Sequence, residues 1–166
     1  NKIYFIINNI KTQSCAFDTK YRCCSYVGRQ REKGTQTVSL GPGCDAVKIA
    51  LHELGHALGF WHEQSRPDRD QYVDIIHENI HPSSMYNFDK MTSKRVNSLG
   101  EAYDYDSIMH YTKNAFAIRE NAETIRPKKC CPRPEIGDRD KLSPSDIIQM
   151  NRLYSCPGKS YFSSQN

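Results

Sequence analysis

A chain of 166 residues with 37% hydrophobic and 25% charged residues has the size and composition of one folded domain, not of a disordered segment. The formal net charge of +4 is mild, and its basic residues are scattered among acids without a long basic block, which argues against nucleic acid as a partner. No apolar run approaches the roughly 18 residues that a membrane-spanning helix requires.

The cysteines point to disulfides and not to a structural metal site. The chain has seven of them, and no two have the CxxC spacing of a zinc ribbon. Their number favours an oxidising compartment, so we expect a secreted, extracellular protein. The odd count leaves at least one thiol unpaired or paired outside this chain. The positions are Cys15, Cys23, Cys24, Cys44, Cys130, Cys131 and Cys156.

The N-terminal part predicts short strands. The apolar run at 3–10 is too short to distinguish a helix from a strand. Two short strands are expected at 25–28 and 35–40, joined by a polar, glycine-containing loop. The Gly-Pro-Gly sequence at 41–43 then interrupts the chain before the next element.

A helix is predicted to begin at Asp45, because apolar residues recur there at helical spacing. Gly59 stands where the left-handed residue that ends a helix is usually found. The apolar residues of the pattern are Ala46, Ile49, Ala50, Leu54, Ala57 and Leu58.

The second half of the chain predicts mostly irregular structure. Residues 65–105 are polar and rich in tyrosine, which favours loops with short helices, and residues 126–140 are expected to form a surface loop. A last helix is predicted from the cap residue Ser143, with Pro144 at its first position, to about Tyr154. Residues 158–166 are expected to be a tail or a linker.

The segment from His52 to His62 carries the chemistry. His52 and His56 are four residues apart on the predicted helix, so both imidazoles project from one face and can bind one metal ion. Glu53 is next to the first histidine, from where its carboxylate can take a proton from water at the metal. Zinc is the expected ion, because it takes neutral imidazole and keeps an open position when it is catalytic.

The third ligand is expected to be His62. Gly59 lets the helix end sharply, so that the chain can fold His62 back to the metal. In thermolysin-like enzymes the third ligand is a downstream glutamate, and Glu78 is the candidate for it here. We favour His62, since Glu78 follows no clear helical pattern.

A second motif lies at 105–111, with the sequence Tyr-Asp-Ser-Ile-Met-His-Tyr. An isolated methionine among aromatics is usually core packing. Together with the long histidine motif, it is typical of the Met-turn of metzincins. Met109 would then give the metal histidines an apolar floor without binding the metal.

These motifs resemble the astacin family of zinc metalloproteases. The extended GFWHEQ sequence at 59–64, the SIMHY sequence at 107–111 and the RPDRD sequence at 66–70 carry the resemblance, which covers about residues 15–157. The double cysteine before Ser25 resembles the one found in the tolloid and bone morphogenetic protein 1 subgroup. The resemblance implies an α+β, two-part metzincin domain: a small twisted sheet with the zinc helix, then an irregular part ending in a helix.

The resemblance also implies roles for single residues. Tyr111 would be a further zinc ligand at rest and would hydrogen-bond the oxyanion during catalysis. Glu63 would pair with the amino terminus freed by removal of a propeptide. Residues 35–40 would bind substrate as an added strand. Arg139, with Lys141 in reserve, would favour an acidic residue just after the cleaved bond.

The resemblance implies some disulfides as well. Cys15 would pair with Cys156, and Cys44 with Cys23 or Cys24. Cys130 and Cys131 have no counterpart in the family. They could bond to each other, to the spare cysteine of the 23/24 pair, or to another chain.

The sequence therefore predicts a zinc metalloendopeptidase acting on a protein or peptide substrate, with no nucleic-acid partner and no membrane span. Residues 1–157 would form the catalytic domain, with a truncated N-terminal part, and a propeptide or additional domains would lie outside this chain. The alternative is a catalytically inactive zinc-binding fragment or interaction domain. The intact Glu53 argues against it, because a binding module has no need of a base.

Overall fold

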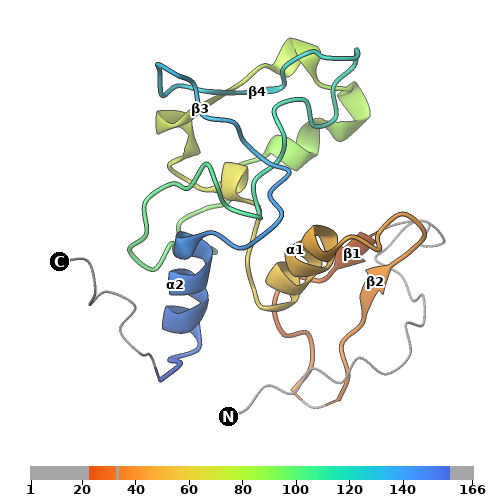
Figure 1. Cartoon of the computed structure of the whole chain (residues 1–166), viewed down its shortest axis with the longest axis vertical. Helices are drawn as coiled ribbons and strands as arrows, with labels where there is room; N and C mark the ends of the chain where they lie inside the picture. The colour runs from red at the N-terminus through yellow and green to blue at the C-terminus, as the bar shows by residue number, and fades with distance from the viewer. Residues whose placement is uncertain (1–22, 33, 158–166) are drawn as a thin grey trace. The chain divides into compact units, whose positions relative to one another are not determined.

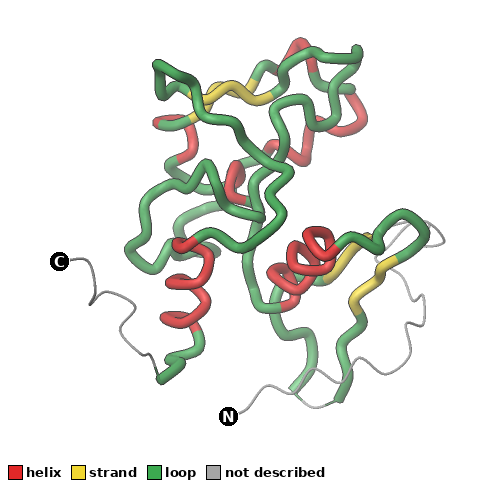
Figure 2. Tube along the Cα trace, in the orientation of Figure 1, coloured by secondary structure: helices red, strands yellow, loops and turns green. Residues whose placement is uncertain are grey.

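The computed structural model of the chain describes residues 23–32 and 34–157. The chain divides into two compact units, Asn1–Trp61 and His62–Asn166. In the described residues, the first contains a two-stranded sheet and one α-helix, and the second contains another two-stranded sheet, short 3-10 helices and one α-helix (Figures 1 and 2). These elements agree with the predicted α+β class. No helix among the described residues is long and apolar enough to cross a membrane.

The sheet of the first unit is shorter than predicted. Strand β1 (Cys23–Ser25) pairs antiparallel with β2 (Val38–Leu40), with Cys23 opposite Leu40. The strand expected at 25–28 is wrong beyond Ser25. Gly28 has a left-handed φ of 74°, and its N–H donates to the carbonyl of His56 at 2.8 Å. The segment therefore turns to satisfy the end of the helix instead of extending the sheet.

Helix α1 (Val47–Ala57) ends as the sequence predicts. Gly59 has φ of 105°, its N–H donates to the His56 carbonyl, and the Phe60 N–H donates to the Gly55 carbonyl. This pair of bonds is a Schellman motif, in which a left-handed residue satisfies the last carbonyls of a helix. Glycine suits the position because it adopts positive φ without a steric penalty.

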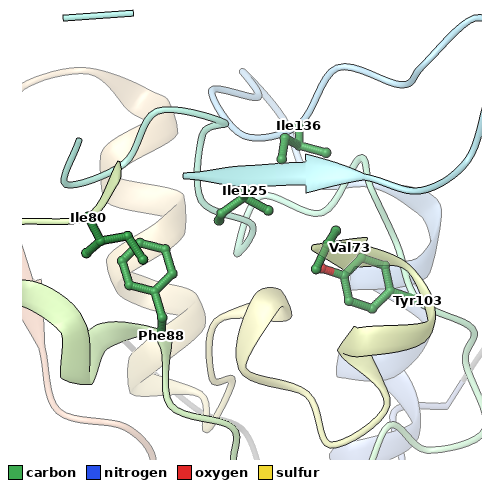
Figure 3. Close-up of a cluster of buried hydrophobic side chains, with 6 residues drawn as sticks. All are labelled: Val73, Ile80, Phe88, Tyr103, Ile125 and Ile136. Atoms are coloured by element: carbon green, nitrogen blue, oxygen red, sulfur yellow. The ribbon is translucent and has the colours of Figure 1, made fainter. Parts of the chain in front are cut away.

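The core of the second unit is built around strands β3 (Val73–Ile75) and β4 (Ile125–Pro127), which pair antiparallel. Figure 3 shows its six buried hydrophobic side chains, and the rings of Tyr72 and Tyr103 stack at its border with centroids 4.7 Å apart. The tyrosine-rich sequence that predicted loops thus supplies part of the core. The six are Val73, Ile80, Phe88, Tyr103, Ile125 and Ile136.

The short helices expected in 65–105 are present as 3-10 turns, but β3 was not expected there. The turns are η1 (Glu63–Ser65), η2 (Arg69–Gln71), η3 (His77–Asn79) and η4 (Pro82–Phe88). The surface loop predicted at 126–140 is only partly correct. Its start belongs to β4, and Ile136 is buried in the core. Pro127 is compatible with a strand because β4 belongs to a two-stranded sheet, in which both strands are edge strands.

The final helix α2 (Pro144–Leu153) begins with the predicted cap. The Ser143 side chain accepts from the Asp146 N–H, and the Asp146 carboxylate accepts from the Ser143 N–H, which makes a reciprocal capping box. The same carboxylate also accepts from the Ser107 hydroxyl at 2.7 Å and from the Ile108 N–H at 3.0 Å. The helix start is therefore tied to the segment that contains Met109.

The cysteines resolve several open pairings. Cys23 bonds to Cys44, and Cys130 bonds to Cys131. Cys24 is also disulfide-bonded. Cys156 is an exposed free thiol, so the expected bond to Cys15 is not made. Cys15 itself lies outside the described residues.

Candidate active site

Helix α1 and the turn after it place three histidines together. The rings of His52 and His56 lie edge to face, with centroids 4.7 Å apart. His52, His56 and His62 each offer one ligand atom, and these atoms all lie within 4.8 Å of one another. Glu78, exposed on η3, is not part of this group. The donor set is three imidazoles, which is a set that catalytic zinc uses.

The His56 ring is neutral and has a fixed orientation. Burial, with a smaller contribution from the neighbouring His52, lowers the pKa of His56 to about 4, so the ring is neutral near pH 7. Its Nδ1 lies 2.8 Å from the carbonyl of Phe60, to which the Nδ1–H donates. The lone pair is then on Nε2, and the hydrogen bond fixes the ring's orientation as metal-binding histidines require.

Glu53 is a buried carboxyl group on the same helix. Its residue is 6% exposed, and burial raises the pKa of the carboxyl to about 7. Its Oε2 is buried and has no hydrogen-bond partner among the described residues. A buried carboxylate oxygen left without a donor fits a site that receives a water molecule from outside the chain.

The Met-turn is held by buried hydrogen bonds. Met109 is 1% exposed. Its carbonyl accepts a hydrogen bond at 3.1 Å from the N–H of Glu63, the residue that directly follows His62. The Ser107 hydroxyl accepts from the Met109 N–H at 3.1 Å while it donates to Asp146. These bonds link the residue after the third histidine to the turn and to α2. The role of Asp146 beyond capping could not be read from the sequence.

Tyr111 lies directly beside His62. Their ring centroids are 4.3 Å apart, and the Tyr111 N–H donates to Oε1 of the fully buried Gln64 at 3.2 Å. Gly137 packs against the Tyr111 backbone so closely that a Cβ there would lie 2.7 Å from the Tyr111 carbonyl carbon. The contacts of Tyr111 with Gln64 and Gly137 have no signal in the sequence, since both residues are remote from Tyr111 along the chain.

Comparison with known proteins decides the family. The model of the peptidase family described as Astacin matches residues 3–155. The chain belongs to the astacin family. The family match confirms the predicted α+β metzincin fold, and His52, His56 and His62 form a group that could hold a metal ion, as predicted for zinc.

Curated relatives of this astacin domain support the predicted subgroup. The chain is 54% identical over 137 residues to bone morphogenetic protein 1 of Xenopus laevis, covering 81% of this chain and 19% of that protein. It is 55% identical over 137 residues to tolloid-like protein 1 of Homo sapiens, covering 81% of this chain and 13% of that protein. The chain thus spans less than a fifth of the length of these relatives.

A solved structure supports the astacin fold directly. High choriolytic enzyme 1, a hatching enzyme zinc-protease from Oryzias latipes, superposes with a TM-score of 0.74 at 46% identity. The match covers 81% of this chain and 65% of that one. At this identity the likeness extends beyond the fold to the sequence of the domain.

Glu63 of this astacin domain has partners within the chain. Its Oε1 accepts from Arg66 Nη1 at 3.1 Å and from the Asp104 N–H at 2.8 Å. Burial raises the pKa of Glu63 to about 7, and Arg66 opposes that rise. Arg66 also donates to Asp68, which makes it a link that sequence reasoning missed. The expected pairing of Glu63 with an amino terminus stays a prediction.

Arg139 has an ion pair that the sequence did not suggest. Its Nη2 lies 2.7 Å from Asp106 Oδ1 and donates to the Glu135 carbonyl at 2.6 Å. The Asp106 side chain is 71% exposed, so this pair is weakly held and its carboxylate is replaceable.

His110, which precedes Tyr111 in the chain, is a buried titratable group. Burial lowers the pKa of His110 to about 4. Its Nδ1–H donates to the Tyr111 carbonyl at 2.7 Å, and its Nε2 accepts from the Tyr103 hydroxyl at 2.7 Å. Burial raises the pKa of Tyr103, which keeps that hydroxyl protonated. A neutral His110 satisfies both partners.

We expect His110 to make the domain sensitive to acid. A histidine with a folded-state pKa of about 4 and an unfolded value near 6.5 stabilises the fold above pH 6.5, and that stability is lost as pH falls towards 4. The loss is about 3 kcal/mol. Denaturant unfolding from pH 7 to pH 4 should therefore show a shallower pH slope for His110→Gln than for the parent. Equal slopes would contradict the assignment.

Proposed function

We propose that this chain is the catalytic domain of a secreted zinc endopeptidase that hydrolyses internal peptide bonds of extracellular proteins. The observation that carries the proposal is the convergence of the three histidine ligand atoms within 4.8 Å, next to the buried Glu53 in the chain. The disulfide between Cys23 and Cys44 supports an oxidising, extracellular setting. We assign the domain to residues 1–157, in agreement with the family match at 3–155.

His52, His56 and His62 hold the metal through neutral imidazoles. Zinc, when bound, supplies a Lewis acid for the scissile carbonyl and makes nearby water more acidic. Glu53 takes the proton of the attacking water and then gives it to the leaving amine. A carboxyl with a pKa raised by burial towards 7 suits both steps, since it gains and loses a proton near neutral pH.

Tyr111 stabilises the oxyanion that forms on the substrate. A phenol hydroxyl donates a hydrogen bond to negative charge as it develops, and its ring contact with His62 keeps it near the metal ligands. The backbone of Tyr111 is fixed by Gln64 and by the close packing of Gly137. The Tyr111 side chain therefore extends from a backbone whose position is fixed.

The test of this role is Tyr111→Phe. We expect the variant to keep its fold and its metal, and to lower kcat by about tenfold or more with little change in KM, because the lost hydrogen bond forms mainly in the transition state. Steady-state cleavage of a quenched fluorescent peptide measures both constants. An unchanged kcat would make Tyr111 a spectator.

Arg139 selects the residue just after the cleaved bond. A guanidinium can hold a carboxylate through two hydrogen bonds, which favours aspartate there over a neutral residue. In the free domain Asp106 occupies the guanidinium at 2.7 Å. A substrate carboxylate would replace the exposed Asp106, so Asp106 weakens the preference without abolishing it.

We expect the parent to cleave a peptide with Asp at this position with a kcat/KM about tenfold above the Ala peptide, as charge-assisted hydrogen bonds provide. Arg139→Ala should remove the preference, and Asp106→Asn should enlarge it. Lys141→Ala is the matched control, since Lys141 is an exposed cation nearby in the chain. A preference that survives Arg139→Ala, or that disappears in Lys141→Ala, contradicts the role of Arg139.

A further inference from the structure

Phe116 combines three features that its sequence position does not explain. Its backbone is left-handed, with φ of 55°, although it is neither a glycine nor an asparagine. Its side chain is only partly buried, because the residue is 43% exposed. Its ring nevertheless lies 5.6 Å from that of Tyr111 and 6.1 Å from that of Phe88, measured between centroids.

The backbone conformation of Phe116 is strained and is held from outside. A bulky residue at positive φ is a genuine outlier, and such strain persists where the surroundings impose it. Here the Phe116 carbonyl accepts from the His81 N–H at 2.9 Å. On its far side the Ile118 N–H donates to the Asn79 carbonyl at 2.8 Å. Ala117 forms a bridge with Ile80, which is buried in the core shown in Figure 3.

The strained backbone directs the Phe116 ring at Tyr111. Among the described residues, the Tyr111 ring lies near those of His62, Phe116 and the buried Phe88, with centroid separations of 4.3, 5.6 and 6.0 Å. Phe88 is 2% exposed and anchored in the core, so it gives a fixed base for the other two rings. Tilted and edge-to-face ring pairs at these separations are attractive and have preferred geometries. The Phe116 ring therefore restricts the directions that the Tyr111 phenol can take.

We propose that Phe116 is a positioning residue for Tyr111, with its ring acting as the wall that keeps the phenol beside His62. This inference rests on the proposed function, in which the Tyr111 hydroxyl stabilises the oxyanion. A side chain that acts in the transition state must be placed within a fraction of an ångström, and a misplacement of about 1 Å can cost on the order of a hundredfold in rate. The strain at Phe116 is the structural cost of that placement.

The experiment replaces the ring without forcing the backbone to move. Asparagine tolerates left-handed φ, so Phe116→Asn removes the ring and relieves the strain. We expect its Tm to stay within about 3 °C of the parent, because relief of strain offsets the lost ring contacts. We expect its kcat to fall by on the order of tenfold with KM little changed. Phe116→Tyr, which keeps a ring, should restore kcat to within about twofold of the parent.

Two comparisons separate positioning from a general structural effect. In the Tyr111→Phe background no hydroxyl remains to be positioned, so Phe116→Asn should cost less than about twofold there. Tyr86→Asn is the matched control: Tyr86 is 70% exposed, and its ring makes no contact with Tyr111 in the described part of the chain. It should leave kcat unchanged.

A measurement without substrate reports the ring directly. In fluorotyrosine-labelled protein, the fluorine signal of Tyr111 is the one that disappears in Tyr111→Phe. We expect Phe116→Asn to shift or split that signal and Tyr86→Asn to leave it in place. A parent-like kcat and an unmoved signal in Phe116→Asn overturn the proposal, as does an equal loss of kcat in both backgrounds. An unchanged kcat in Tyr111→Phe instead overturns the role of Tyr111 in the proposed function, while the fluorine signal still decides whether Phe116 holds the ring.

Discussion

Glu53→Gln should keep its zinc and lose between about 10²-fold and 10⁴-fold of turnover, which is the usual cost of removing a general base. The amide is close to the carboxyl in shape, so the substrate site and the metal ligands stay in place. It cannot accept the proton of the attacking water. Cleavage of a quenched peptide gives the turnover, and metal analysis gives zinc per chain. Activity within about tenfold of the parent would remove Glu53 from the role of base.

A stability measurement distinguishes this loss from unfolding. Burial raises the pKa of Glu53 from its ordinary value to about 7. A carboxyl with a raised folded-state pKa stabilises the fold at low pH, and that contribution is lost as pH rises through 7. At pH 8 the metal-free Gln variant should therefore be at least as stable as the metal-free parent. Glu78→Gln, on the exposed turn η3, is the matched control and should change neither turnover nor stability.

The metal-binding segment could be predicted because its geometry is local. A helix places residues four apart on one face, and the glycine that ends it has a positive φ whatever surrounds it. His52, His56 and Gly59 therefore follow from the sequence alone, and the structure gives them the expected helix and the expected φ of 105°. The cap of α2 at Ser143 was predictable for the same reason, since its partner Asp146 is only three residues away.

The core of the second unit could not be predicted because its contacts are remote in sequence. Val73 pairs with Pro127, and Tyr72 stacks on Tyr103, whereas local composition at these positions favours turns. The same holds around Tyr111. Gly137 and Phe116 were absent from the predicted site, because nothing in their own sequence neighbourhoods indicates a contact with that tyrosine. A local sequence pattern predicts which side chains share a face of one element, but it does not predict which other element packs against that face.

Charged side chains were the least predictable part of the site. Arg139 forms an ion pair with Asp106, which is remote in the chain and was not a predicted site residue. Glu63 accepts hydrogen bonds from Arg66 and from the Asp104 backbone, two partners that the sequence did not indicate, while its pairing with an amino terminus stays a prediction. The tertiary fold determines which charged groups come close to a long flexible side chain, so proximity in sequence is a poor guide to ion pairs.

Removal of one metal ligand should abolish activity altogether. In His62→Ala only two imidazoles remain on α1, and we expect the zinc content to fall well below one per chain. Turnover should drop by more than about a thousandfold, because the Lewis acid worth several kcal/mol of transition-state stabilisation is lost with the metal. Dialysis of the parent against a chelator should give the same loss. Added zinc should restore the parent, whereas a stoichiometric amount of zinc should not restore His62→Ala.

His81→Ala is the matched control, because His81 is exposed and contacts Ser83 outside the histidine group. It should retain both zinc and turnover. Full zinc content in His62→Ala would show that the third ligand is another residue, and a folded parent with far less than one zinc per chain would contradict the metal site itself.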